Sequence, residues 1–145
     1  MRRRLLEFAL LGTGVMFAAA AQAQVPRTDS VAGATVYFIQ PQDGATVKSP
    51  FKVVMGLSGM GVAPAGVDQP ETGHHHLLVD LDKLPEENQP IPTDDHHRHF
   101  GKGQTETSLT LPPGKHTLQL LLADRNHISH RPPVFSQKIT IDVAP

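Results

Sequence analysis

"TETSLTLPPGKHTLQLLLAD", residues 105–124, is the stretch that most clearly predicts the fold. Polar and apolar residues alternate over 105–111, which is the period of two expected of a half-buried strand. The residues "PPGK" supply a tight turn, and a second, more apolar strand is expected over 116–124. This part of the chain therefore predicts two short strands separated by a tight turn.

The chain on either side of this stretch follows the same pattern. Further strands are expected at 34–40, 51–59, 74–81 and 134–143. Proline and glycine recur between them, and no long apolar stripe of period 3.6 predicts a helix. The segments 59–73 and 125–133 are interpreted as loops, and 82–103 as a long polar, proline-rich connection. We therefore expect an all-β fold, an immunoglobulin-like antiparallel β-sandwich of about seven strands.

His116 supplies one detail that favours the immunoglobulin-like arrangement. In that fold a tyrosine at the corner before a strand precedes an inward-facing position by two residues. Here His116 takes the corner position and Leu118 the inward one. Histidine also combines an apolar ring with a polar tip, so the comparison is an analogy between side chains of similar character.

The N-terminal residues have the pattern of a Sec-type signal peptide, expected over residues 1–23. Three arginines precede an apolar run from Phe8 to Ala20, and the small-x-small site ends at Ala23. An uncleaved anchor is the alternative, but the run is short for a span of about 20 residues. We therefore expect a periplasmic protein free of the membrane after cleavage, with secretion as the alternative location. A flexible segment, 24–33, then precedes one β-sandwich domain, 34–145.

Composition excludes several functional classes. The 13 Lys and Arg residues nearly balance the 14 Asp and Glu residues, so no nucleic acid partner is expected. The chain has no cysteine, which removes disulfides, thiolate ligands and a cysteine nucleophile together. A site for a soft metal ion must therefore use histidine, methionine or carboxylate.

All nine histidines lie between residues 74 and 130. In an antiparallel sandwich with the expected strand order, the start of strand 74–81, the end of the connection 82–103 and the loop 125–133 share one pole. Eight imidazoles therefore converge there, and only His116 falls at the other end. This convergence of segments distant in sequence is the main functional inference from the sequence.

Alternation along 74–81 divides the three consecutive histidines between two faces. His75 shares its face with Leu77, Val79 and Leu81, which predicts a structural role at the edge of the core. His74 and His76 point the other way and form an H-x-H pair. Neutral imidazole is a common ligand of zinc and copper. The candidate metal ligands are His74, His76, His99 and His127, followed by His97, His130 and Asp124.

Four segments carry a resemblance to a known family. They are "PQDGATVKSPFKVVMGLSGMGVAPAG", "TGHHHLLVD", "HFGKGQTETSLTLPPGKHTLQLLLAD" and "NHISHRPPVFSQKITI". Over about residues 35–143 the chain resembles the bacterial domain of unknown function 4399 family. The resemblance implies a small exported domain and supplies no mechanism. The family pattern maps onto His74, His75, His76, His99, Gly101, Gly103, Gln104, Thr105, Glu106, His116, Asp124, His127, Pro132 and Pro133.

Three hypotheses of function follow from these observations. The first is a periplasmic protein that holds or passes on copper or zinc without catalysis. The second is a non-catalytic binding or assembly module that presents the histidine-rich pole to an envelope protein. The third is a metallohydrolase in which three histidines leave a position open for water, with Glu106 or Asp124 as the base.

Overall fold

The computed structural model describes residues 25–145, which form nine strands. These are β1 (Thr35–Gln40), β2 (Thr46–Lys48), β3 (Phe51–Ser58), β4 (Gly61–Val62), β5 (Thr72–Val79), β6 (His97–His99), β7 (Glu106–Leu109), β8 (Gly114–Ala123) and β9 (Ile139–Ala144). No helix among these residues is long and apolar enough to cross a membrane. The expected signal peptide, residues 1–23, lies outside the described residues.

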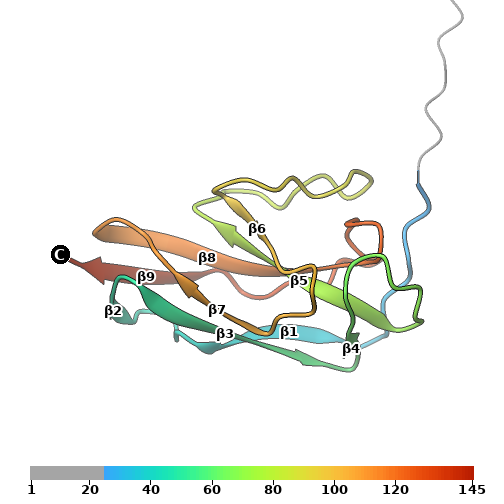
Figure 1. Cartoon of the computed structure of the whole chain (residues 1–145), viewed down its shortest axis with the longest axis horizontal. Helices are drawn as coiled ribbons and strands as arrows, with labels where there is room; N and C mark the ends of the chain where they lie inside the picture. The colour runs from blue at the N-terminus through green and yellow to red at the C-terminus, as the bar shows by residue number, and fades with distance from the viewer. Residues whose placement is uncertain (1–24) are drawn as a thin grey trace, which may run out of the picture.

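Two facing sheets form the framework of the domain (Figure 1). The smaller sheet has the order β1-β3-β7, and the larger has the order β2-β9-β8-β5-β4, with β6 also paired to β5. Only β2 and β4 join their neighbours in parallel. The expected all-β fold is confirmed. The separation of β1, β3 and β7 from β5, β8 and β9 is compatible with the expected immunoglobulin-like arrangement.

The main core lies between the sheets and follows from alternation along the strands. On β3, Phe51, Val53 and Met55 are buried, while Lys52 between them is exposed. On β8, Leu118 and Leu120 are completely buried and pack in the same cluster. Burying each such side chain contributes about 1.5–3 kcal/mol. These inward-facing residues fix the register of β8, and through β8 they fix the position of β5.

A second apolar cluster covers the outer face of the larger sheet. It contains Leu78 of β5 and Leu121 of β8, packed against Ile91 from the segment 80–96. We call this segment the covering connection, because it crosses over β5 and β8 (Figure 1). The last residues of β8 are therefore buried on both faces of the sheet. A site on this face is partly shielded from bulk solvent as a result.

The sequence predicts 82–103 as a polar, proline-rich connection, and this prediction is incomplete. Its apolar residues Leu84 and Ile91 stand singly among prolines and charges, so they carry no periodic signal. Within the predicted loop, β6 forms because it pairs with β5, which sequence periodicity does not report. The structure likewise has nine strands rather than about seven, since β2 arises between two expected strands and β4 arises in a stretch interpreted as a loop.

Two further details of the sequence interpretation need correction. Leu81 was expected on the core face, but Asp80 has a φ of 55° and ends the regular alternation, so Leu81 packs in the outer cluster. The last strand was expected over 134–143, but regular pairing begins only at Ile139. Before it, Val134 and Ser136 make single backbone hydrogen bonds to β8.

His116 lies at the corner where β8 begins, apart from the other histidines. Its Nε2 lies 2.9 Å from the carbonyl oxygen of Pro112, and its Nδ1 lies 2.7 Å from Oδ2 of Asp80. Burial opposes protonation, but the hydrogen bonds to Asp80 and Pro112 outweigh it and raise the pKa of His116. Both ring nitrogens can donate in the protonated form, so His116 ties the start of β8 to the end of β5.

Candidate metal centre

The three consecutive histidines of β5 are all completely buried. His75 pairs with Leu122 and shares its face with Leu77 and Val79, which belong to the main core. Neither ring nitrogen of His75 makes a hydrogen bond within the protein. Burial lowers the pKa of His75 to about 4, so its ring is neutral at pH 7. This is an unusual core residue, because it brings two polar atoms into an apolar layer without partners.

His74 and His76 occupy the opposite, outer face, where two other segments bring further imidazoles. Strand β6 pairs antiparallel with β5 and sets His99 directly across from His76. After β8 the chain turns through residues 124–130, which we call the His127 loop. His127 has a left-handed φ of 64°, and its backbone N–H donates to the carbonyl of Asp124 at 3.0 Å. This turn returns the His127 side chain to the face on which His74 lies.

Four rings gather at this point, from β5, β6 and the His127 loop. Five of their six centroid separations lie between 4.8 and 5.2 Å, and the sixth, between His76 and His127, is 6.4 Å. A ring bound to an ion at about 2.05 Å has its centroid about 3.2 Å from that ion, so tetrahedral neighbours would be about 5.2 Å apart. Five of the six centroid separations are therefore close to the value expected for imidazoles that share one tetrahedral ion.

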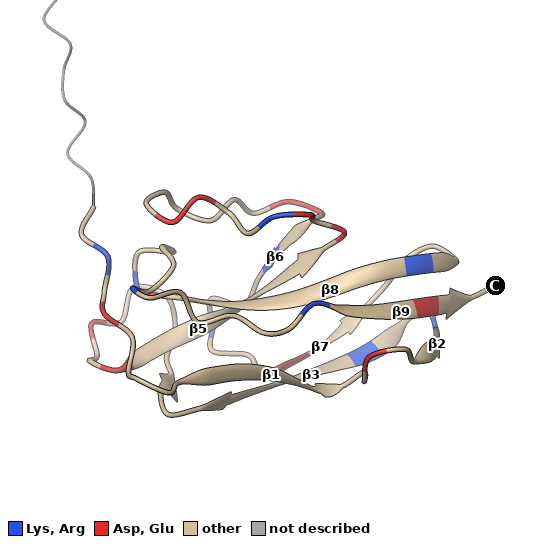
Figure 2. Cartoon of the chain, turned by 180° about the vertical axis from the view of Figure 1, so that it is seen from behind, with Lys and Arg blue, Asp and Glu red and all other residues tan. Residues whose placement is uncertain are grey.

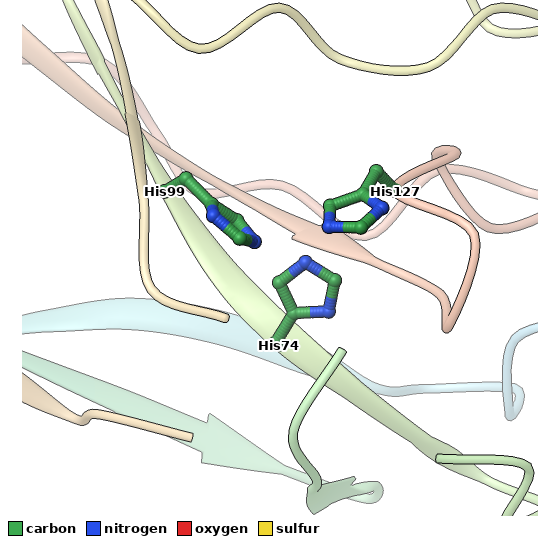
Figure 3. A group of neighbouring side chains, drawn as sticks. All are labelled: His74, His99 and His127. Atoms are coloured by element: carbon green, nitrogen blue, oxygen red, sulfur yellow. The ribbon is translucent and has the colours of Figure 1, made fainter. Parts of the chain in front are cut away.

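Three of the four rings, which we call the tight group, bring ligand atoms close to one another. Ligand atoms of His74, His99 and His127 all lie within 4.8 Å of one another. In Figure 3 a ring nitrogen of His74 points into the gap between the rings of His99 and His127. Tetrahedral coordination at about 2.05 Å requires nitrogens about 3.4 Å apart, so small side-chain rotations would complete the geometry. The residues present fit a metal ion with imidazole ligands.

Protonation of His74, His76 and His99 is suppressed. Burial is the first cause of the lowered pKa of His74, about 4, and of His76, about 2, and the neighbouring imidazoles add to it. Burial and the proximity of His127 also lower the pKa of His99. Neutral imidazole is the form that binds metal, because each ring then has one free lone pair. His74, His76 and His99 are therefore held in their ligating form at pH 7.

Several ring nitrogens in the cluster have no protein partner. They are Nδ1 of His74, Nδ1 of His76 and Nε2 of His99, all buried. Buried polar atoms are normally hydrogen-bonded, since leaving one unpaired costs about 1–3 kcal/mol. The covering connection and the His127 loop thus enclose polar atoms that have no hydrogen-bond partner within the protein. Such orphaned donors and acceptors are expected where a ligand completes the site.

The other three candidates lie outside the tight group. His97 sits two residues before His99 on β6, and its Nδ1 lies 2.8 Å from Oδ1 of Asp94. His130 is buried, with Nε2 3.2 Å from the carbonyl of Thr72. A side chain added at Gly73 would meet the His130 ring at 2.8 Å, so this ring lies over the face of β5 that His75 shares. The expected gathering of eight imidazoles thus separates into a compact four and their neighbours.

Both carboxylate oxygens of Asp124 accept hydrogen bonds, from the His127 loop and from Thr28. Its Oδ1 accepts the backbone N–H groups of Asn126, at 2.8 Å, and Ile128, at 3.1 Å. Its Oδ2 accepts the hydroxyl of Thr28 at 2.9 Å. Asp124 is 1% exposed and lies close to His74. Its charge acts to raise the pKa of His74, against the larger effect of burial. Through these hydrogen bonds the carboxylate stabilises the conformation of the loop, so it is not a free ligand.

Two residues beside the cluster were not singled out as site residues by sequence reasoning. A Cβ at Gly101 would overlap the ring of His99, so glycine is needed for the observed position of that ring. Asp94 accepts the backbone N–H groups of His96 and His97 as well as the His97 ring. The "DDHHRHFG" motif contains both residues, but their roles depend on the fold of β6 against β5.

The fold and the site together define an all-β domain that carries a buried histidine cluster on one sheet face. The chain matches the model of the family described as Domain of unknown function (DUF4399) over residues 53–144. It belongs to this family, and the matched residues include β5, β6 and the His127 loop. No curated protein and no solved structure matches the chain.

Proposed function

We propose that this protein binds a copper or zinc ion through His74, His99 and His127, with His76 as a fourth imidazole. The observation that carries the proposal is the meeting of ligand atoms from three separate segments within 4.8 Å. A lone histidine has many structural uses. A convergent group of imidazole rings with unpartnered, buried nitrogens has far fewer.

The donor set supports copper or zinc over harder ions. Imidazole suits zinc and copper, whereas magnesium and calcium prefer carboxylate, carbonyl and water oxygens. The carboxylate nearest in the loop, Asp124, is already used by four hydrogen-bond donors. Because the chain has no cysteine, a blue-copper ligand set is excluded, and the proposed role is to hold or pass on the ion.

Exchange of the ion is supported by the partial exposure of the site. His74 and His76 are completely buried, but His99 and His127 are only half-buried. The covering connection carries six acidic residues against one lysine, and Figure 2 shows acidic residues spaced along it. A negative potential beside the half-buried rings favours the approach of cations. We place this role in the periplasm, as the N-terminal sequence pattern suggests.

The test is a titration of metal-free, untagged protein with Cu(II) and Zn(II), using a chromophoric chelator as competitor. We expect about one equivalent to bind with a Kd below micromolar for at least one ion. His74→Ala should weaken binding by 100-fold or more, on the order of 3 kcal/mol, because it removes the most buried member of the tight group.

His96→Ala is the matched control. His96 lies in the same histidine-rich segment, but its ring is directed to the carbonyl of Val79 at 2.9 Å and takes no part in the cluster. Its removal should leave the Kd within about twofold. Binding weaker than micromolar in the native protein, or equal losses in the two variants, would refute the proposal.

A further inference from the structure

The segment just before β1 contacts the candidate metal centre through its supporting loop. The backbone N–H and the hydroxyl of Thr28 donate to Oδ2 of Asp124, at 3.3 and 2.9 Å. Backbone hydrogen bonds join Ser30 to Arg131 and Arg131 to Thr28, each at 3.0 Å. Residues 27–30, which lie in a segment predicted to be flexible, are thus hydrogen-bonded along the His127 loop and to the residue that follows it.

Arg27 joins three segments through one guanidinium group. Its Nε donates to the carbonyl of Ser129 at 3.0 Å, and another nitrogen donates to the carbonyl of His130. The remaining nitrogen pairs with Glu87 of the covering connection at 2.6 Å. The Arg27 side chain is only 11% exposed, whereas that of Glu87 is 55% exposed. Arg27 therefore lies in the structure as an internal tie rather than as a surface charge.

The loop that Arg27 and Thr28 contact determines where His127 lies. Oδ1 of Asp124 holds the two backbone N–H groups on either side of His127, and the Asp124 carbonyl accepts the N–H of His127 itself. The carbonyl of His127 accepts from Ile91 of the covering connection at 2.8 Å. His127 adopts a left-handed φ, which a non-glycine residue keeps only when its surroundings enforce it.

We propose that Arg27 and Thr28 are positioning residues of the metal centre, which hold His127 in ligating geometry through Asp124 and the loop carbonyls. The inference rests on the proposed function and extends it to a segment outside the residues matched by the family model. Thr28 donates to the second carboxylate oxygen of Asp124. Arg27 holds the loop through the carbonyls of Ser129 and His130. The affinity of the site for its ion therefore depends on docking of this segment.

Thr28→Val is the sharpest test, because valine keeps the shape of threonine and removes only the hydroxyl donor. Thr28→Ser keeps the donor and should restore native behaviour. Ser30→Ala is the matched control, since its hydroxyl donates to the Pro132 carbonyl at 2.9 Å from the same segment but does not touch Asp124. Arg27→Lys, which keeps the charge and loses the forked contacts, tests the second tie independently.

Three measurements are made on each full-length variant: the Kd for Cu(II) by chelator competition, the nitrogen couplings of the Cu(II) complex by electron paramagnetic resonance, and the unfolding midpoint of the metal-free protein. We expect Thr28→Val and Arg27→Lys to raise the Kd by about 10–100-fold, as is typical when a support of a metal ligand is lost. The spectrum should change to one with fewer coupled imidazoles, while Thr28→Ser and Ser30→Ala retain the native values.

The outcomes separate this inference from the proposed function. Native protein that binds neither ion overturns both. Native protein that binds copper, with Thr28→Val and Arg27→Lys showing a Kd within twofold and an unchanged spectrum, overturns only the positioning role. A lowered unfolding midpoint with native affinity and spectrum assigns the segment to stability alone, and this also overturns the inference.

Discussion

Nε2 of His76 lies 3.1 Å from Nε2 of His74, on the outer face of β5. Two neutral imidazoles that meet in this way share a single proton between the two nitrogens, because two lone pairs facing each other would repel. Two ligands of one tetrahedral ion bound at about 2.05 Å would have their nitrogens about 3.4 Å apart. The observed separation therefore suits either a shared proton or a shared ion with little movement.

The contact between His76 and His74 predicts that His76 is also a metal ligand, although it lies outside the tight group. We expect His76→Leu to weaken metal binding by about tenfold or more, because the ion loses an imidazole and His74 loses its partner. Competition titration against native protein measures the loss. Leucine fits the apolar surroundings of Leu78 and Leu121, so the metal-free variant should remain folded. Affinity equal to that of the native protein would show that His76 is not a ligand.

The stability of the metal-free protein should depend on pH through the buried histidines. Burial lowers the pKa of His74 and His75 to about 4 and that of His76 to about 2, against 6.5 for an exposed ring. Below pH 6.5 the unfolded chain therefore binds more protons than the folded one, and folding loses stability as the pH falls. The raised pKa of His116 acts in the opposite direction, because its contribution is greatest at low pH.

Urea unfolding of metal-free protein between pH 7.5 and 4.5 tests this expectation. The midpoint should be highest at pH 7 and above, and should decline steadily below pH 6.5. Metal should protect against the decline, since a ligand bound only to the folded state stabilises it. A midpoint that stays level or rises between pH 6.5 and 4.5 would be incompatible with neutral, buried histidines.

His75→Leu should stabilise the protein without affecting the metal. His75 lies on the core face with two unpartnered nitrogens, so an apolar side chain of similar size removes a desolvation penalty of about 1–3 kcal/mol. The unfolding midpoint at pH 7 should rise, and its decline below pH 6.5 should become shallower. The Kd for copper should stay within about twofold. A large loss of affinity would place His75 in the site instead of the core.

Gly101→Ala should damage the metal centre while every histidine remains in the chain. A Cβ at this position overlaps the observed His99 ring, which must move to make room. We expect the Kd to rise by about 10–100-fold, as for the loss of a residue that orients a ligand. His99→Ala provides the upper limit. Native affinity together with a native copper spectrum would show that the His99 position seen here is not the binding position.

The sequence was sufficient for the principal strands, because alternation reports directly which residues face a core. The division of "HHH" also followed from alternation: His75 faces the core, and His74 and His76 face outwards. The convergence of β5, the residues before β7 and the loop after β8 followed from the expected strand order. Local patterns and topology thus placed three distant segments near one another.

What the sequence could not predict depends on contacts between distant residues. The role of the covering connection in packing cannot be predicted from its polar sequence. Single apolar residues such as Ile91 form the outer cluster only once β5 and β8 are in place. Asp124 was predicted as a candidate ligand on its chemistry alone. Its hydrogen bond to Thr28 joins residues 96 positions apart in the sequence, so it becomes visible only in the folded chain.

X-ray absorption spectroscopy of the purified protein loaded with one equivalent of copper or zinc tests the central claim most directly. We predict a first shell of nitrogen at about 2.0–2.1 Å, with the outer-shell scattering of three or four imidazoles. In His74→Ala the number of imidazoles should fall by one or the metal should be lost. A first shell made mainly of oxygen, or one or no imidazoles in the native protein, would contradict the proposed site.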